Sequence, residues 1–185
     1  AAFSADVGVT SSLYPFTLCT PAQLECLAAI RAPKPELRPE MWEAITFWNQ
    51  SLAIPERRDV DKPEVKRGEA LFASSGCAMC HVPEWRTGKY PAVPVISNQR
   101  IRPYTDLLLH DMGPDLADGR PDFKASGSDW RTPPLWGIGL SKQVSASTSF
   151  LHDGRARNLL EAVVWHGGEA QASRDKFTAL PAEQR

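Results

Sequence analysis

The stretch Gly76–Pro83, GCAMCHVP, decides how the rest of the chain is interpreted. It holds Cys77, Cys80 and His81 in a Cys-x-x-Cys-His pattern. In a c-type haem site both thiols bond to the porphyrin, and the imidazole that follows them binds the iron. A zinc site and a thiol–disulfide redox pair use similar cysteine spacings. The remaining sequence must choose among these three kinds of site.

Zinc and thiol exchange leave more of the sequence unexplained than haem does. Zinc takes four ligands, whereas Cys19 and Cys26 lie far upstream and do not form a second Cys-x-x-Cys pair. A thioredoxin-like pair is expected at the start of a helix after a strand, but here a helical pattern precedes Cys77. We therefore predict one haem c, bound covalently through Cys77 and Cys80, with His81 as an iron ligand. A zinc or thiol module at these cysteines is the less favoured alternative.

The composition predicts short helices joined by long ordered loops, and together with the haem motif it leads us to expect a mostly α-helical, cytochrome c-like haem domain. Sixteen prolines and 12 glycines are spread along 185 residues, which favours short elements over a regular sheet. Residues 91–97, PAVPVIS, are the one modest strand candidate. The net charge of −1 gives no electrostatic basis for binding nucleic acid. The longest apolar runs are too short for a transmembrane span.

Prolines mark where helices are expected to begin. Pro39 and Pro63 each open a run with apolar residues at helical spacing. We expect residues 1–60 to form an N-terminal helical segment that packs on the haem domain, and residues 61–185 to form the cytochrome c-like domain. Pro181 stands where another helix would begin, and four residues follow it, so the C-terminal helix is expected to be truncated.

The two remaining cysteines are expected to fit the compartment in which haem c is attached. Attachment takes place outside the cytoplasm, where disulfides persist. Cys19 and Cys26 can close a small loop there by forming a disulfide. The alternative is a pair of buried free thiols.

The ligand opposite His81 would set the spin state and the potential of the iron. His166 is favoured because it shares a helical face with Leu159 and Val163, an apolar stripe suited to a porphyrin. Met112 is the runner-up, since thioether ligands from loops after the haem motif are common in cytochromes c.

The other histidines and several arginines have supporting roles in this interpretation. His110 and His152 lie in polar turns and are expected to be structural. Haem propionates need hydrogen-bond donors, for which Arg131 is the first candidate and Arg102 and Arg155 are further ones.

Seven segments resemble the C-terminal half of the bacterial di-haem oxidoreductases, distant relatives of the di-haem cytochrome c peroxidases. These segments are DVGVTSSLYP (6–15), CTPAQ (19–23), RRDVDKPEVKRGEALF (57–72), CAMCH (77–81), IRPYTDLLLHDMGPDLADGR (101–120), WRTPPLWGIGL (130–140) and FLHDGRARNLLEAVVWHGGEA (150–170). The resemblance spans nearly the whole chain.

The resemblance implies a partner, a compartment and a ligand position. Full-length members carry a further haem-bearing segment before this region, which would be one partner, and a redox protein would be another. The expected location is the periplasm or another extracytoplasmic space. In the peroxidase relatives the residue at the position of His166 is the distal iron ligand. That residue is Met, or Tyr in one enzyme, so the histidine here differs from both. Those relatives also bind calcium between two haem domains, but the carboxylate spacing here does not support a calcium site.

Two functions follow from these expectations. The first is a domain that transfers electrons through one haem, as part of a di-haem peroxidase-type oxidoreductase, with His81 and His166 on the iron. The second is a self-contained haem peroxidase whose distal site is open or labile. Electron relay is favoured over peroxide binding for this domain.

Overall fold

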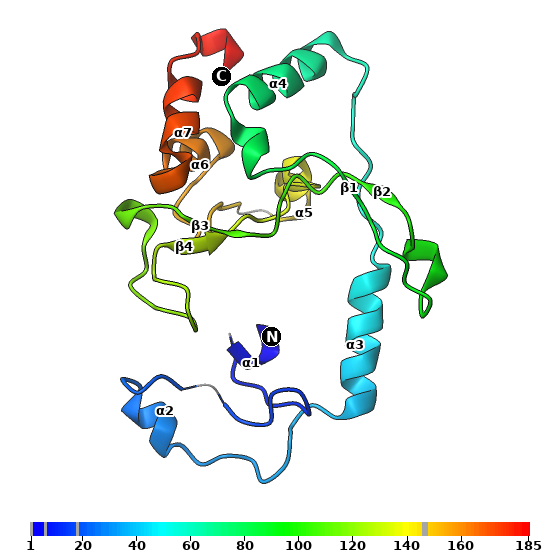
Figure 1. Ribbon diagram of the computed structural model, residues 1–185, viewed down its shortest axis with the longest axis vertical. Helices are drawn as coiled ribbons and strands as arrows, with labels where there is room; N and C mark the ends of the chain where they lie inside the picture. Colours follow the sequence, from blue (N-terminus) through cyan, green and yellow to red (C-terminus); the bar gives the residue numbers. More distant parts are fainter. Residues whose placement is uncertain (1, 6, 18, 146–147) are drawn as a thin grey trace. The chain divides into compact units, whose positions relative to one another are not determined.

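A computed structural model describes residues 2–5, 7–17, 19–145 and 148–185 (Figure 1). Its α-helices are α1 (Ala2–Ala5), α2 (Leu24–Ala28), α3 (Pro39–Ser51), α4 (Pro63–Ser74), α5 (Ser141–Val144), α6 (Leu159–Val164) and α7 (Gln171–Thr178). Its strands are β1 (Trp85–Arg86), β2 (Arg100–Ile101), β3 (Leu109–Asp111) and β4 (Asp129–Arg131). Among the described residues helix is thus much more extensive than strand, and the short helices and long loops agree with the proline and glycine pattern, while the cytochrome c-like fold stays a prediction.

The chain divides into two compact units, residues 1–53 and 54–185. In the first unit, the Thr10 backbone N–H donates to Glu36 at 3.1 Å, and Ser11 bridges to Leu37. The predicted disulfide between Cys19 and Cys26 is present, with Cα atoms 5.9 Å apart. The packing of residues 1–60 on the haem domain stays a prediction.

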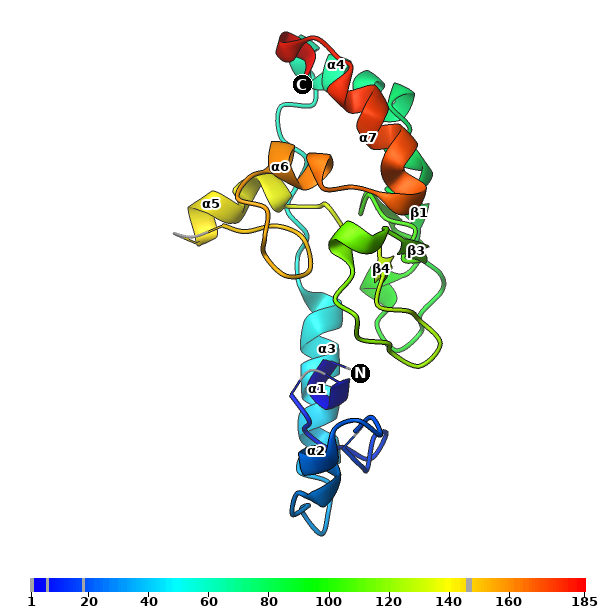
Figure 2. The same ribbon diagram turned by 90° about the vertical axis from the view of Figure 1, so that its left-hand side faces the viewer.

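In the second unit, α4 leads directly into the Cys-x-x-Cys-His motif. Pro63 occupies the first helical position, where its missing N–H costs no hydrogen bond. After α4 the backbone of Gly76 is left-handed, with φ of 89°, and a 3-10 turn follows over Cys77–Met79. A Cβ atom on Gly76 would lie 2.8 Å from Ser173 Oγ, which places α7 against this turn (Figure 2). Only glycine suits both the left-handed backbone and the close approach.

Two antiparallel hairpins follow the motif. Strand β1 pairs with β2, and β3 pairs with β4 so that His110 lies opposite Trp130. The prediction of a strand over residues 91–97 is wrong, because Pro94–Ile96 forms a 3-10 helix. Pro91 and Pro94 lack the N–H that a strand ladder needs, which explains the difference.

Few apolar side chains are buried in the described part of the second unit: Val93, Leu116, Ala156 and Ala162. A chain of this size is expected to bury about two-thirds of its surface on folding. The protein atoms alone therefore supply a small core. None of the helices among the described residues has the length and apolar character needed to cross a membrane.

Candidate functional site

The His81 imidazole is hydrogen-bonded to the backbone of the loop that precedes β3. Its Nδ1 lies 3.0 Å from the carbonyl oxygen of Tyr104. Tyr104 adopts a left-handed backbone, with φ of 55°, which is uncommon for an aromatic residue. Burial lowers the pKa of His81, although the hydrogen bond to Tyr104 acts in the other direction. A neutral imidazole with Nδ1 engaged presents Nε2 as a free lone pair, as a metal ligand requires.

His166 has the same arrangement at the end of α6. Asn158 caps this helix by accepting a hydrogen bond from the Glu161 backbone N–H at 2.8 Å. The Nδ1 of His166 lies 2.8 Å from the carbonyl oxygen of Ala162, one turn earlier. This hydrogen bond also leaves Nε2 available.

The two imidazoles lie close together although they are far apart in the sequence. Their ring centres are 6.5 Å apart, and the ring planes are inclined by 47°. Two imidazole–metal bonds of about 2 Å each, together with the distance from each ring centre to its nitrogen, span roughly 6 Å. The separation therefore fits one metal ion held between both Nε2 atoms.

Cys77 and Cys80 are free thiols, partly buried, on the turn before His81. Burial raises the pKa of Cys77. Burial also raises the pKa of Cys80, and the charges of Asp106 and Glu169 add to this effect. Thiols that exchange disulfides react as the thiolate, which a raised pKa disfavours. The surroundings of this pair thus oppose the thiol-exchange alternative.

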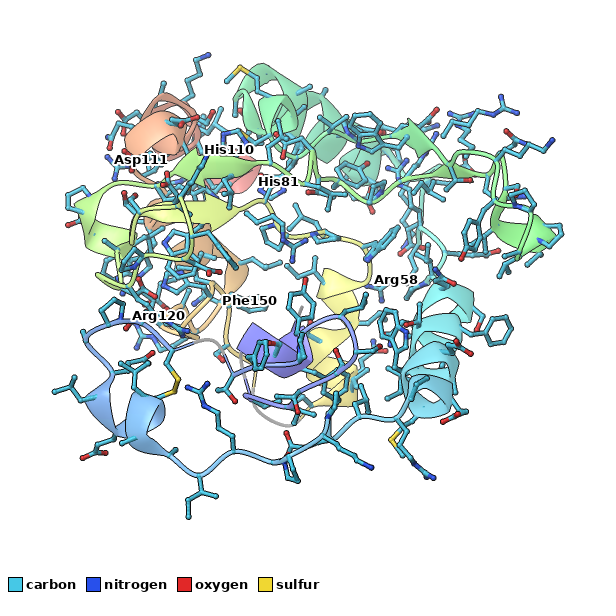
Figure 3. The ribbon with its side chains drawn as sticks, turned by 60° about the horizontal axis from the view of Figure 1, so that its bottom comes forward. Arg58, His81, His110, Asp111, Arg120 and Phe150 are labelled. Atoms are coloured by element: carbon cyan, nitrogen blue, oxygen red, sulfur yellow. A yellow bond between two sulfur atoms is a disulfide. The ribbon has the colours of Figure 1, made fainter. Side chains whose placement is uncertain are left out.

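His110, which is labelled in Figure 3, lies beside Cys80 in a clamp formed by the carboxylates of Asp106 and Glu169. Its Nδ1 is 2.9 Å from Glu169 Oε2 and 3.8 Å from Cys80 Sγ, and its Nε2 is 2.9 Å from Asp106 Oδ2. The hydrogen bond to Glu169 raises the pKa of His110, against a smaller effect of burial, and Asp106 raises it further. With both ring nitrogens engaged, His110 is a poor candidate for an iron ligand.

Only part of this clamp can be predicted from the sequence. Asp106 precedes His110 by four residues, so a local interaction could have been anticipated. Glu169 is 59 residues from His110 and offers no local signal. Cys80, Asp106 and His110 place one ligand atom each within 4.8 Å of one another, the one such metal-capable group found among the described residues.

Met112, the second candidate for the ligand opposite His81, is partly buried. It lies in the loop after β3, which packs against the segment that follows His166. A Cβ atom on Gly167 would lie 2.9 Å from the Met112 carbonyl oxygen, and one on Gly113 would lie 3.0 Å from the Gly168 nitrogen. The glycines after His166 thus admit this loop.

The arginines proposed for the propionates lie in different surroundings. Arg131 is exposed at the end of β4. Arg102 lies 3.4 Å from Glu84, and Arg155 lies 2.6 Å from Asp153, with its guanidinium over the Trp165 ring. Whether any of them binds a propionate stays a prediction.

The donor set fits a haem. Two thiols precede one imidazole, and a second imidazole stands at the distance a shared iron requires. The small core of the second unit fits the same group, because a buried porphyrin would supply apolar volume that the side chains lack.

No curated protein and no solved structure matches the sequence. Residues 2–185 match the family described as "Di-haem oxidoreductase, putative peroxidase". The match covers the motif, both imidazoles and the disulfide loop. The chain belongs to the di-haem oxidoreductase family.

Proposed function

We propose that this chain is a c-type cytochrome domain that transfers electrons through one covalently bound haem, within a di-haem peroxidase-type oxidoreductase. The observation that carries the proposal is the 6.5 Å separation of the His81 and His166 rings, each with Nδ1 at a backbone carbonyl. This arrangement supports iron with an imidazole on each face.

Each residue has a defined task in this proposal. Cys77 and Cys80 bond to the porphyrin, and His81 and His166 bind the iron. When bound, the haem supplies one-electron chemistry between ferric and ferrous iron. The Tyr104 and Ala162 carbonyls accept the Nδ1 protons, which fixes ring orientation and increases the basicity of Nε2. With both imidazoles on the iron, no coordination site would be left for peroxide, so the domain would relay electrons and would not bind peroxide.

The family context supports a partner and a compartment. The family is di-haem, whereas these 185 residues contain one Cys-x-x-Cys-His motif. The second haem would therefore come from another segment or chain, and a separate redox protein would exchange electrons with the pair. The Cys19–Cys26 disulfide favours an oxidising compartment such as the periplasm.

The test is an optical spectrum of the protein made in a host that attaches haem c, before and after reduction with dithionite. We expect a low-spin spectrum and a pigment that stays on the chain after denaturation. His166→Ala should convert the iron to high spin, whereas His152→Ala, a control outside the ligand pair, should leave the spectrum unchanged.

Other outcomes would point to the alternatives. Conversion to high spin in Met112→Ala, with His166→Ala silent, would make Met112 the sixth ligand. A high-spin wild type that turns over peroxide would favour the self-contained peroxidase. Absence of covalent pigment would reject the cytochrome proposal and favour a metal at Cys80, Asp106 and His110.

A further inference from the structure

A series of neighbouring side chains leads from the Cys80 sulfur to the surface, and the proposed function does not use it. The series begins at Cys80, which in the proposed function is bonded to the porphyrin and so marks the edge of the haem. His110 Nδ1 lies 3.8 Å from this sulfur. The imidazole is fixed by Asp106 and Glu169, and its side chain is only 16% exposed. The first link is therefore short and rigid.

The second link crosses the β3–β4 hairpin. His110 and Trp130 are register partners in this antiparallel pair. Side chains of directly opposed residues lie on the same face of a hairpin, with Cβ atoms about 5 Å apart. The Trp130 indole is fixed in turn, because its Nε1 donates to the Leu116 carbonyl oxygen at 3.1 Å, and Leu116 is buried.

The third link is a stacked aromatic pair. The rings of Trp130 and His152 are 3.4 Å apart between centres, with planes inclined by 11°. His152 is presented by a loop that closes through the Phe150–Ala156 bridge, whose first residue is labelled in Figure 3. Leu151, next to it, has a left-handed backbone with φ of 71°. A branched side chain in this conformation is strained, so the surrounding contacts must hold the loop in place.

His152 lies at the surface, because it and the neighbouring Asp153 are both exposed residues. We propose that His110, Trp130 and His152 form the path by which electrons pass between the haem and a one-electron carrier protein docked on the 150–156 loop. This inference rests on the proposed function. The physical basis is that electron tunnelling weakens steeply with distance, and neighbouring, fixed side chains leave no wide gap between the Cys80 sulfur and the loop.

The transfer is balanced without bond changes. One electron leaves the carrier, which is oxidised, and arrives at the ferric iron, which becomes ferrous. Trp130 keeps its bonds and its proton, and serves as the medium between the two centres.

The test delivers an electron at the loop by light. A thiol-reactive ruthenium tris(bipyridine) label is attached to Asp153→Cys, next to His152, in the haem-loaded protein. The introduced cysteine is the free thiol available for labelling, because Cys19 and Cys26 are paired and the motif thiols are bonded to haem. A laser flash then drives one electron from the label to the iron, and absorbance gives the rate.

Trp85→Leu is the matched control for Trp130→Leu. Each tryptophan lies on a short strand and donates Nε1 to a backbone carbonyl, Trp85 to Thr105 at 2.7 Å, but Trp85 is not in the series. We expect Trp130→Leu to slow transfer by at least an order of magnitude, Trp130→Phe to retain part of the rate, and Trp85→Leu to have no such effect. His152→Leu should also slow it, while the haem spectrum and midpoint potential stay unchanged in all variants.

Two results would overturn the inference in different ways. Equal rates in Trp130→Leu and Trp85→Leu, with an intact haem spectrum, would reject the path and leave the cytochrome proposal standing. A labelled parent protein without haem would reject both.

Discussion

At the scale of single residues, the four histidines differ in how their ring nitrogens are used. His81 and His166 each have one nitrogen at a backbone carbonyl and one free. His110 has both nitrogens at carboxylates, and His152 is stacked on an indole. The hydrogen bonds of the ring nitrogens thus distinguish the candidate iron ligands from the other two histidines. The sequence distinguishes them only by the residues that flank each histidine.

The His110 clamp predicts a pH-dependent contribution to stability. The pKa of His110 is raised in the folded chain above the usual 6.5, chiefly by Glu169. A raised pKa means that the charged pair stabilises the fold fully below the unfolded pKa and that this stabilisation is lost as pH rises through the folded pKa. The difference in unfolding free energy between wild type and His110→Gln should therefore decrease from about pH 5 to about pH 9.

Urea unfolding at a series of pH values measures this difference directly. Comparing the two proteins at each pH cancels the titration of other groups. A difference that stays constant or grows with pH would show that His110 is not held as the imidazolium ion. Glu169→Gln serves as the companion variant, because it removes the contact with the largest effect on the pKa and should reduce the pH dependence.

At the scale of elements, the sequence predicts the features that depend on local chemistry, such as where a helix begins. Helices α3 and α4 begin at the expected prolines, Pro39 and Pro63, because proline is pre-set for the first helical position. The hairpins were missed, because strands of two or three residues are too short to display alternation. The separation of His81 and His166 and the contact of His110 with Glu169 depend on tertiary packing, so no local pattern encodes them.

The contact between the 111–113 loop and the segment after His166 predicts a strong glycine requirement. Gly168 has φ of 51°, and a Cβ atom there would collide with the Asp111 carbonyl oxygen and the Gly113 nitrogen. We expect Gly168→Ala to destabilise the fold by about 2 to 4 kcal/mol, from the strained backbone and the collision together. Urea unfolding gives the value, and the visible spectrum reports whether His166 is displaced.

Gly88→Ala is the control for that substitution. A Cβ atom on Gly88 would meet nothing within 4 Å, and its φ is not positive. Its effect should stay within about 0.5 kcal/mol. Equal effects of the two substitutions would mean that the close approach of the two backbones does not exist in solution.

At the scale of the whole molecule, the described residues have more exposed than buried apolar side chains. Large ones with more than half of their surface exposed include Leu107, Leu108 and Leu109, next to the His110 clamp. A fold with so few buried apolar residues gains little from side-chain packing. Its stability must therefore depend on additional apolar material, and the candidate site indicates a porphyrin.

This dependence gives the last prediction. The double variant Cys77→Ser, Cys80→Ser cannot form thioether bonds to a haem, and after extraction of any haem bound without them it should lose the cooperative transition on heating while keeping part of its helical circular dichroism. Such a state has lost tertiary packing and exposes apolar surface, so that it binds the dye ANS. Met79→Ala is the matched control, because Met79 lies between the two cysteines but is 70% exposed and leaves both thiols in place. A sharp transition at the same temperature in the double variant and in Met79→Ala would mean that the chain holds its fold without the haem.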